Sequence, residues 1–272
     1  MLKRILTAIV AILIFIPVCI FSNTIVLPIA IALLSVISVF EISKCLNFHK
    51  NLFLTIPLYC LSVALPIFRC FVKTNAFFLS HIPIIFIGLL FYMLSYVMLR
   101  KNKDNLSEVI TLYALSLFIV SGFNSILMIR LMSNGKAVYL LAFLGAWICD
   151  TFAYFTGMLI GKHKLIPEIS PKKTIEGAIG GVIFTVIGFA VYGLIWNSIS
   201  PDNKLSYLTL CIFGLVLSVA SQFGDLIASS IKRQYNLKDY GFIFPGHGGV
   251  LDRFDGVLLV APCLYVLNHF LG

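Results

Sequence analysis

The sequence predicts an all-α, polytopic integral membrane protein with about nine transmembrane helices and a cytoplasmic N-terminus. Three observations support this class. Hydrophobic residues make up 60% of the 272 residues and charged residues only 11%, unlike the composition of a soluble domain. The apolar residues form runs of about 20, the length that a helix needs to cross a bilayer. Lysine and arginine residues concentrate on one side of these runs.

The apolar runs follow one another with short connections. They cover residues 4–21, 25–43, 52–68, 77–99, 107–129, 137–159, 175–197, 205–228 and 250–271. The first run also resembles a signal peptide, but no A-x-A-like cleavage site follows it, so we expect a retained helix. We expect residues 1–135 to form scaffold and lipid-facing helices. We expect residues 136–272 to form the catalytic region, because acids and glycines enter the helices from Trp147 onward.

Loop charges predict the orientation. Five of the 20 lysines and arginines lie in loops opposite the N-terminus, namely Arg69, Lys73, Arg130, Lys136 and Lys204, and the other fifteen lie on its side. This positive-inside bias places the junctions before 175–197 and 250–271 in the cytoplasm. Because the chain is compact, we expect a bacterial inner membrane. The net charge of +9 then reflects topology and attraction to anionic membrane lipid, and we expect no nucleic-acid partner.

Two features of the helices are expected to be structural. The seven cysteines are scattered and form no CxxC pair or Cys/His cluster, so we expect them to be packing residues. Glu41 lies at the cytoplasmic end of the run 25–43. We expect its carboxylate to snorkel toward water.

Asp150 is an acid inside the run 137–159. A carboxylate near the bilayer centre costs about 2.5–3.5 kcal/mol on insertion scales. Tyr154, Gly157 and Gly161 follow on the same helical face, and the two glycines permit close helix contact. Asp150 is either satisfied by a buried hydroxyl or functional, and we expect Asp150 and Tyr154 to support a site.

The loop before the run 175–197 combines cations with helix-start residues. Ser170 and Pro171 predict a turn or helix start, and Thr174 is a good N-cap. Glu176 would lie in the first helical turn, where the helix dipole favours an acid and where it would support the site. Lys172 and Lys173 are either phosphate ligands or positive-inside anchors.

The run 205–228 ends in a polar face. Ser229 and Lys232 follow Asp225 at i+4 and i+7, with Arg233 beside them. If the helix continues beyond the membrane, a carboxylate, a hydroxyl and a cation line one groove.

The turn before the last helix contains Gly248 and Gly249, which let backbone N–H groups approach an anion closely. Asp252 and Asp225 would converge from two helix ends as oxygen ligands for Mg²⁺. His247 is a metal ligand, a phosphate donor or a turn residue. Together these groups suit a phosphate ligand with its metal ions, which predicts an active site.

These residues carry a resemblance. The segment from Ser229 to Asp255 resembles the signature of the phosphatidate cytidylyltransferases, also called CDP-diacylglycerol synthases. The matching positions are Ser229, Lys232, Arg233, Lys238, Asp239, Gly241, Pro245, His247, Gly248, Gly249, Asp252, Arg253 and Asp255. Supporting similarity covers Asp150 with Tyr154, residues 170–174, and Glu176 with Gly177.

The resemblance implies that CTP and phosphatidate react to CDP-diacylglycerol and pyrophosphate. It implies Mg²⁺ at Asp225 and Asp252, K⁺ as a second cation, and a homodimer. We assign catalytic roles to Lys232, Arg233, Asp239, His247, Arg253 and Asp255. We assign substrate binding to Lys172, Lys173, Ser229, Lys238, Gly248 and Gly249.

Two other functions fit parts of the pattern. A CTP-dependent lipid kinase, acting on a polyprenol or diacylglycerol, would share charged cytoplasmic junctions, but the full signature favours cytidylyl transfer. An ion-coupled transporter would need paired broken helices in symmetric halves, whereas the acids here cluster in one half.

Overall fold

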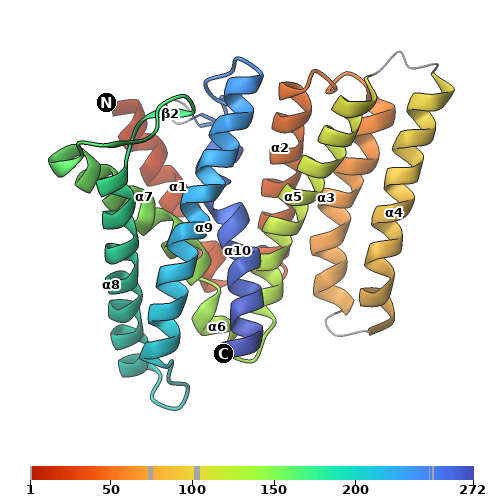
Figure 1. Ribbon diagram of the computed structural model, residues 1–272. Helices are drawn as coiled ribbons and strands as arrows, with labels where there is room; N and C mark the ends of the chain where they lie inside the picture. The colour runs from red at the N-terminus through yellow and green to blue at the C-terminus, as the bar shows by residue number, and fades with distance from the viewer. Residues whose placement is uncertain (1, 73–75, 101–104, 245, 247) are drawn as a thin grey trace. The chain divides into compact units, whose positions relative to one another are not determined.

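The computed structural model describes residues 2–72, 76–100, 105–244, 246 and 248–272 (Figure 1). It is a helical chain in the order α1 (Leu2–Ile20), α2 (Val26–Cys45), α3 (Leu52–Val72), α4 (Ala76–Leu99), α5 (Leu106–Arg130), α6 (Gly135–Val138), α7 (Leu141–Ile160), β1 (Lys164–Ile166), β2 (Ser170–Thr174), α8 (Ile175–Ile199), α9 (Tyr207–Gln234) and α10 (Leu251–Leu271).

The helices confirm the predicted membrane class. Within the described residues, eight helices are long and apolar enough to cross a bilayer, α6 and α7 forming one of these spans together. In the described part of α1 the apolar stretch is shorter, Ile9–Ile20. Many large apolar side chains stay exposed along the helices, such as Phe91, Leu159 and Leu208. Lipid tails can cover such surfaces while the helix satisfies its own backbone groups.

The chain divides into two compact units. Unit 1 holds residues 1–124 and 239–251, and unit 2 holds residues 125–238 and 252–272. The segment 229–255, predicted as the signature of the site, is therefore shared between the units. The expected roles of residues 1–135 and 136–272 stay a prediction.

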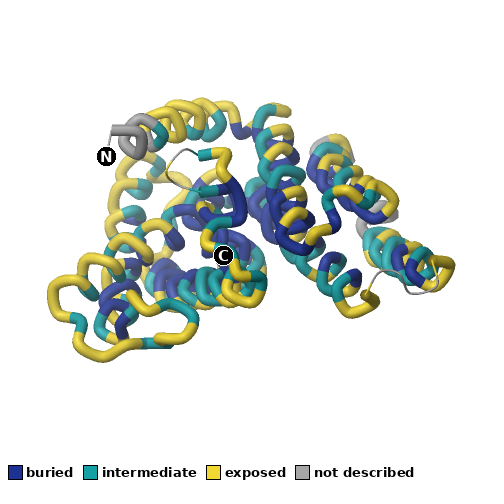
Figure 2. The backbone as a smooth tube through the Cα atoms, turned by 90° about the horizontal axis from the view of Figure 1, so that it is seen from above, coloured by how far each residue is buried: buried dark blue, intermediate teal, exposed yellow. Residues whose placement is uncertain are grey.

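In unit 1, α2 packs along α3. Both helices carry fully buried aliphatic side chains, among them Val39 and Ile42 of α2 and Leu54 and Leu58 of α3. Ser43 and Tyr59 add a hydroxyl–hydroxyl hydrogen bond of 2.9 Å between the same helices. Figure 2 shows buried and exposed residues on the same helices, as expected of helices with one face in a protein core and one in lipid.

In unit 2, α7 and α8 pack closely through small residues. A Cβ added at Gly177 would lie 3.2 Å from the Gly157 Cα, and one added at Gly181 would lie 3.0 Å from the Cys149 carbonyl oxygen. The predicted close contact at Gly157 is thus confirmed. Small residues let helix backbones approach, which gives packing energy that the hydrophobic effect does not supply in lipid.

The segment before α8 differs from the prediction of a turn or helix start at Ser170. Residues 164–166 and 170–174 form an antiparallel hairpin, with Lys164 opposite Thr174 and Ile166 opposite Ser170. The three-residue strand β1 is too short to give a strand pattern in the sequence. Thr174 is confirmed as the N-cap of α8, because its Oγ1 accepts the Gly177 N–H at 3.1 Å.

The structure contradicts the expectation that the Glu41 carboxylate snorkels toward water. The residue is only 2% exposed in α2. Its carboxylate accepts the backbone N–H groups of Val250 and Leu251 at 3.0 and 2.8 Å, all within unit 1. Backbone donors from a distant part of the chain satisfy the charge in place of water.

Candidate active site

Two ion pairs form the centre of the charged cluster in unit 2. Asp225 of α9 pairs with Lys173 of β2 and accepts a hydrogen bond from the Ser229 hydroxyl at 3.4 Å. Asp252, in the first turn of α10, pairs with Lys232 of α9, with Nζ and Oδ1 2.8 Å apart. The Asp252 side chain is 2% exposed, so this pair is largely removed from water.

Two more acids join this cluster. Asp150 of α7 and Asp255 of α10 are each close enough to Asp225 for their charges to repel. Asp150 is also attracted by Lys173 and Arg253, and Asp255 by Lys232. Four carboxylates and three cations from α7, β2, α9 and α10 therefore share one electrostatic environment.

Helix geometry explains why the acids meet. A Cβ added at Gly224 would lie 2.7 Å from the Asp255 carbonyl oxygen and 3.1 Å from the Gly256 Cα. The backbones of α9 and α10 therefore touch next to Asp225 and Asp255. In addition, α9 continues to Gln234, six residues past its expected end. This continuation places Ser229 and Lys232 on the face of Asp225.

In the hairpin, Lys172 and Lys173 lie in different surroundings, although the sequence predicts the same role for both. Successive side chains of a strand point to opposite faces. Lys173 is partly buried against Asp225, whereas Lys172 is exposed. Glu176 fixes the base of the hairpin, since its carboxylate accepts the N–H groups of Lys162 and His163 at 3.1 and 3.2 Å.

The remaining predicted residues of unit 2 lie at the edge of this cluster or outside it. Arg233 is exposed and donates from Nε to the Ile169 carbonyl at 3.5 Å. Lys238 is exposed. Tyr154 is 65% exposed, and its ring contacts that of Phe155 rather than the acids.

In the part of the signature that lies in unit 1, Phe244 and Gly248 lie opposite each other. The Phe244 N–H donates to the Gly248 carbonyl at 2.9 Å. Gly248 has a φ of 87°, which glycine adopts without strain. Asp239 is half-buried and Gly249 is buried. His247, which we predicted as a site residue, lies outside the described residues.

The donor chemistry of the cluster fits Mg²⁺. Mg²⁺ is usually held by one or two carboxylates together with substrate phosphates and water, and Asp225 and Asp252 offer such oxygens. In the part of the chain that the structure describes, no three His, Cys, Asp or Glu side chains form a complete metal cage. A metal at these acids would therefore need substrate or water oxygens as further ligands.

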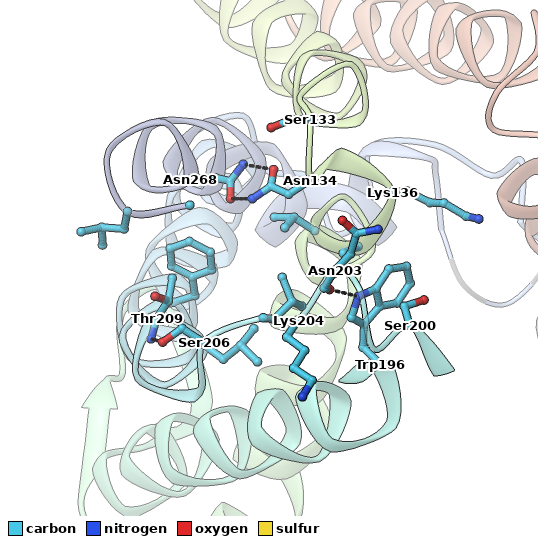
Figure 3. A pocket seen from close by; sticks show the side chains of 17 residues that line it. Ser133, Asn134, Lys136, Trp196, Ser200, Asn203, Lys204, Ser206, Thr209 and Asn268 are labelled. Carbon is cyan, nitrogen blue, oxygen red and sulfur yellow. Dashed lines mark hydrogen bonds between the residues drawn. The ribbon is translucent and has the colours of Figure 1, made fainter. Parts of the chain in front are cut away.

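A cavity of about 450 Å³ lies elsewhere in unit 2 (Figure 3). It is next to α6, at the end of the unit opposite the hairpin. Asn134 and Asn268 exchange two amide hydrogen bonds of 2.9 Å on its wall. Its lining contains none of the predicted site residues, so the charged cluster is the better candidate for chemistry.

Glu41 is a buried acid of unit 1 whose backbone partners could not be predicted from the sequence. The only sign in the sequence is its isolation, as an acid within an otherwise apolar run. Its partners are 209 and 210 positions away, and no local pattern could have shown them.

Comparisons with known proteins identify the family to which the chain is similar. The chain matches the cytidylyltransferase family over residues 2–271. It is 37% identical over 265 residues to a phosphatidate cytidylyltransferase of Staphylococcus haemolyticus, with 97% of each chain covered. It is 34% identical over 265 residues to one of Staphylococcus aureus, again with 97% of each covered. It is 39% identical over 176 residues to one of Bacillus subtilis, with 64% of each covered.

Proposed function

The chain belongs to the cytidylyltransferase family, and on that premise we propose that it converts CTP and phosphatidate to CDP-diacylglycerol and pyrophosphate. A phosphate oxygen of phosphatidate forms a bond to the α-phosphorus of CTP. The bond between the α-phosphorus and the bridging oxygen breaks, and pyrophosphate leaves with the electron pair. No general base is required, because the attacking phosphate is already anionic.

The meeting of carboxylates and cations in unit 2 is the observation that carries this proposal. Two polyanionic substrates must come together, which needs cations within a site that also holds acids. Lys173 and Lys232 are fixed by Asp225 and Asp252, so their ammonium groups are placed beside the carboxylates. Charge-assisted hydrogen bonds from such cations hold phosphate oxygens strongly. Arg253, which interacts with Asp150, supplies a further cation.

Asp225 and Asp252 would hold Mg²⁺ in this proposal. When bound, Mg²⁺ polarises a phosphoryl group and neutralises a leaving pyrophosphate. We propose K⁺ as a second cation and a homodimer from the family resemblance alone.

The lipid substrate would reach the site from the membrane. The last turn of α7 exposes Met158, Leu159 and Ile160, directly before the hairpin that carries Lys173. Apolar side chains beside a cationic cluster suit a molecule with acyl chains and a phosphate head group. We propose that this end of the protein faces the cytoplasm of a bacterial inner membrane, where CTP and Mg²⁺ are available.

The test uses purified protein in mixed micelles of phosphatidate with α-labelled CTP, with and without Mg²⁺. We expect label in the lipid phase and an equal amount of pyrophosphate, both lost on Mg²⁺ removal. Label transfer to diacylglycerol or a polyprenol from γ-labelled CTP would show a lipid kinase instead. No transfer from either label would contradict both enzyme functions, and ion-transport assays would follow.

A further inference from the structure

Glu41 is a buried acid in unit 1 that the proposed chemistry does not use. Burying a carboxylate is costly unless hydrogen bonds satisfy it. Oε1 accepts the Val250 N–H at 3.0 Å, and Oε2 accepts the Leu251 N–H at 2.8 Å. Both oxygens of one carboxylate thus hold two successive backbone donors.

These two donors lie at the start of α10. The first N–H groups of a helix have no partner within the helix, and a polar side chain of the preceding residue usually accepts one of them. Val250 precedes α10 and has no polar side chain. Glu41 therefore caps α10 from 209 positions earlier in the chain, and its negative charge also suits the positive end of the helix dipole.

Two glycines of the signature make room for this carboxylate. A Cβ added at Gly241 or at Gly249 would collide with the Glu41 side chain. The positive-φ glycines in this part of the chain are Gly246 and Gly248. Glycine is therefore needed at 241 and 249 because any side chain would collide with Glu41. A positive φ is not the reason at these two positions. The signature segment thus lies against the Glu41 carboxylate at two places, at Gly241 and at Gly249 to Leu251.

We propose that Glu41 is a positioning residue for cytidylyl transfer. It holds Gly241 and the residues from Gly249 to Leu251 in place and fixes the first N–H groups of α10. Asp252 follows Leu251 directly in the chain, so the same contact sets where the helix that carries this acid begins. This inference rests on the proposed function for its catalytic consequence, but the contact itself can be tested without turnover.

The first test substitutes Glu41→Gln, which keeps the shape of the side chain and removes its charge and one acceptor. We expect kcat to fall at least about tenfold, as for residues that orient ligands through hydrogen bonds. We also expect faster amide hydrogen exchange in peptides covering 239–251. Glu41→Asp keeps the charge on a shorter side chain, and we expect it to restore part of kcat.

Ile42→Ala is the matched control, because Ile42 is the next residue of α2 and is 1% exposed. It should lower the melting temperature and leave both kcat and exchange in 239–251 near the wild-type values. If Glu41→Gln keeps wild-type kcat and wild-type exchange, the inference is wrong. If Glu41→Gln loses total activity only in proportion to the loss of folded protein, with kcat per folded molecule unchanged, Glu41 is merely structural.

A double substitution tests the contact with Gly241. Gly241→Ala alone should reduce activity and speed exchange, since its methyl group meets the carboxylate. In a Glu41→Ala background the methyl group has room, and the second substitution should add no further loss. Equal losses in both backgrounds would contradict the contact. If the wild type makes no CDP-diacylglycerol, the proposed function fails, while the exchange measurements still decide the role of Glu41.

Discussion

Lys172 and Lys173 are adjacent residues of equal charge with different surroundings. The strand turns Lys173 toward Asp225 and leaves Lys172 exposed. We expect Lys173→Ala to reduce kcat/KM for CTP by about 100-fold, the scale seen when a group that stabilises transition-state charge is removed. Lys172→Ala is the matched control and should change it less than about threefold. Steady-state assays of both variants decide this, and equal effects would mean that the lysines act only through general surface charge.

The two acids that pair with lysines are also expected to be essential. Asp225→Asn and Asp252→Asn keep the side-chain shape but remove a charge that binds cations. We expect each to lower kcat by at least about 100-fold while the protein still inserts into the membrane. Asp202→Asn, in the exposed loop between α8 and α9, is the control for loss of an acid. Normal turnover by either purified site variant would remove its carboxylate from the metal site.

Contacts between neighbours in sequence could be predicted, and distant pairs could not. The Thr174 cap and the shared face of Asp225 and Ser229 follow from helix geometry, because they depend on spacings of three and four residues. The pairing of Lys173 with Asp225 and the burial of Glu41 depend on how separate elements pack. Spacing in the sequence carries no information on that packing.

At the scale of elements, glycines determine how closely α7 and α8 approach. A Cβ added at Gly180 would lie 2.6 Å from the Thr156 Cβ. We therefore expect Gly180→Ala to destabilise the protein by about 1–3 kcal/mol, as overpacking does. Gly88 in α4 has nothing within 4 Å of an added Cβ. Gly88→Ala should be neutral or stabilise by up to about 1 kcal/mol. Thermal unfolding in detergent compares the two, and equal stabilisation of both variants would show that helix propensity rather than packing decides.

The helices themselves were largely predictable, since runs of apolar residues of membrane length have few alternative structures. The predicted runs 25–43 and 175–197 correspond to Val26–Cys45 and Ile175–Ile199. The hairpin was not predicted, because β1 has only three residues. The predicted end at 228 marks where apolar residues stop, but α9 continues through polar residues to Gln234.

At the scale of the whole molecule, the contiguous signature from Ser229 to Asp255 contributes residues to both compact units. Residues 239–251 belong to unit 1, and the preceding Lys238 and following Asp252 belong to unit 2. A linear motif cannot reveal such a division. It does reveal the chemistry, because the 27 residues from Ser229 to Asp255 contain four cations, three acids and several glycines.

The orientation and the number of spans can be tested together. Nine spans put the two termini on opposite sides of the membrane, whereas eight put them on the same side. If α1 spans and the N-terminus is cytoplasmic, alkaline phosphatase fused after Gly272 should be active in the periplasm, and fluorescent protein fused there should stay dark. Phosphatase fused within the hairpin, after Glu168, should be inactive, because that loop carries the cytoplasmic cations. A tag at the N-terminus should resist protease added to intact spheroplasts.

Active phosphatase at Glu168 would place the cluster outside the cytoplasm, away from CTP, and would contradict the proposed reaction. A protease-sensitive N-terminal tag with active phosphatase at the C-terminus and inactive phosphatase at Glu168 would instead mean that α1 does not cross the membrane.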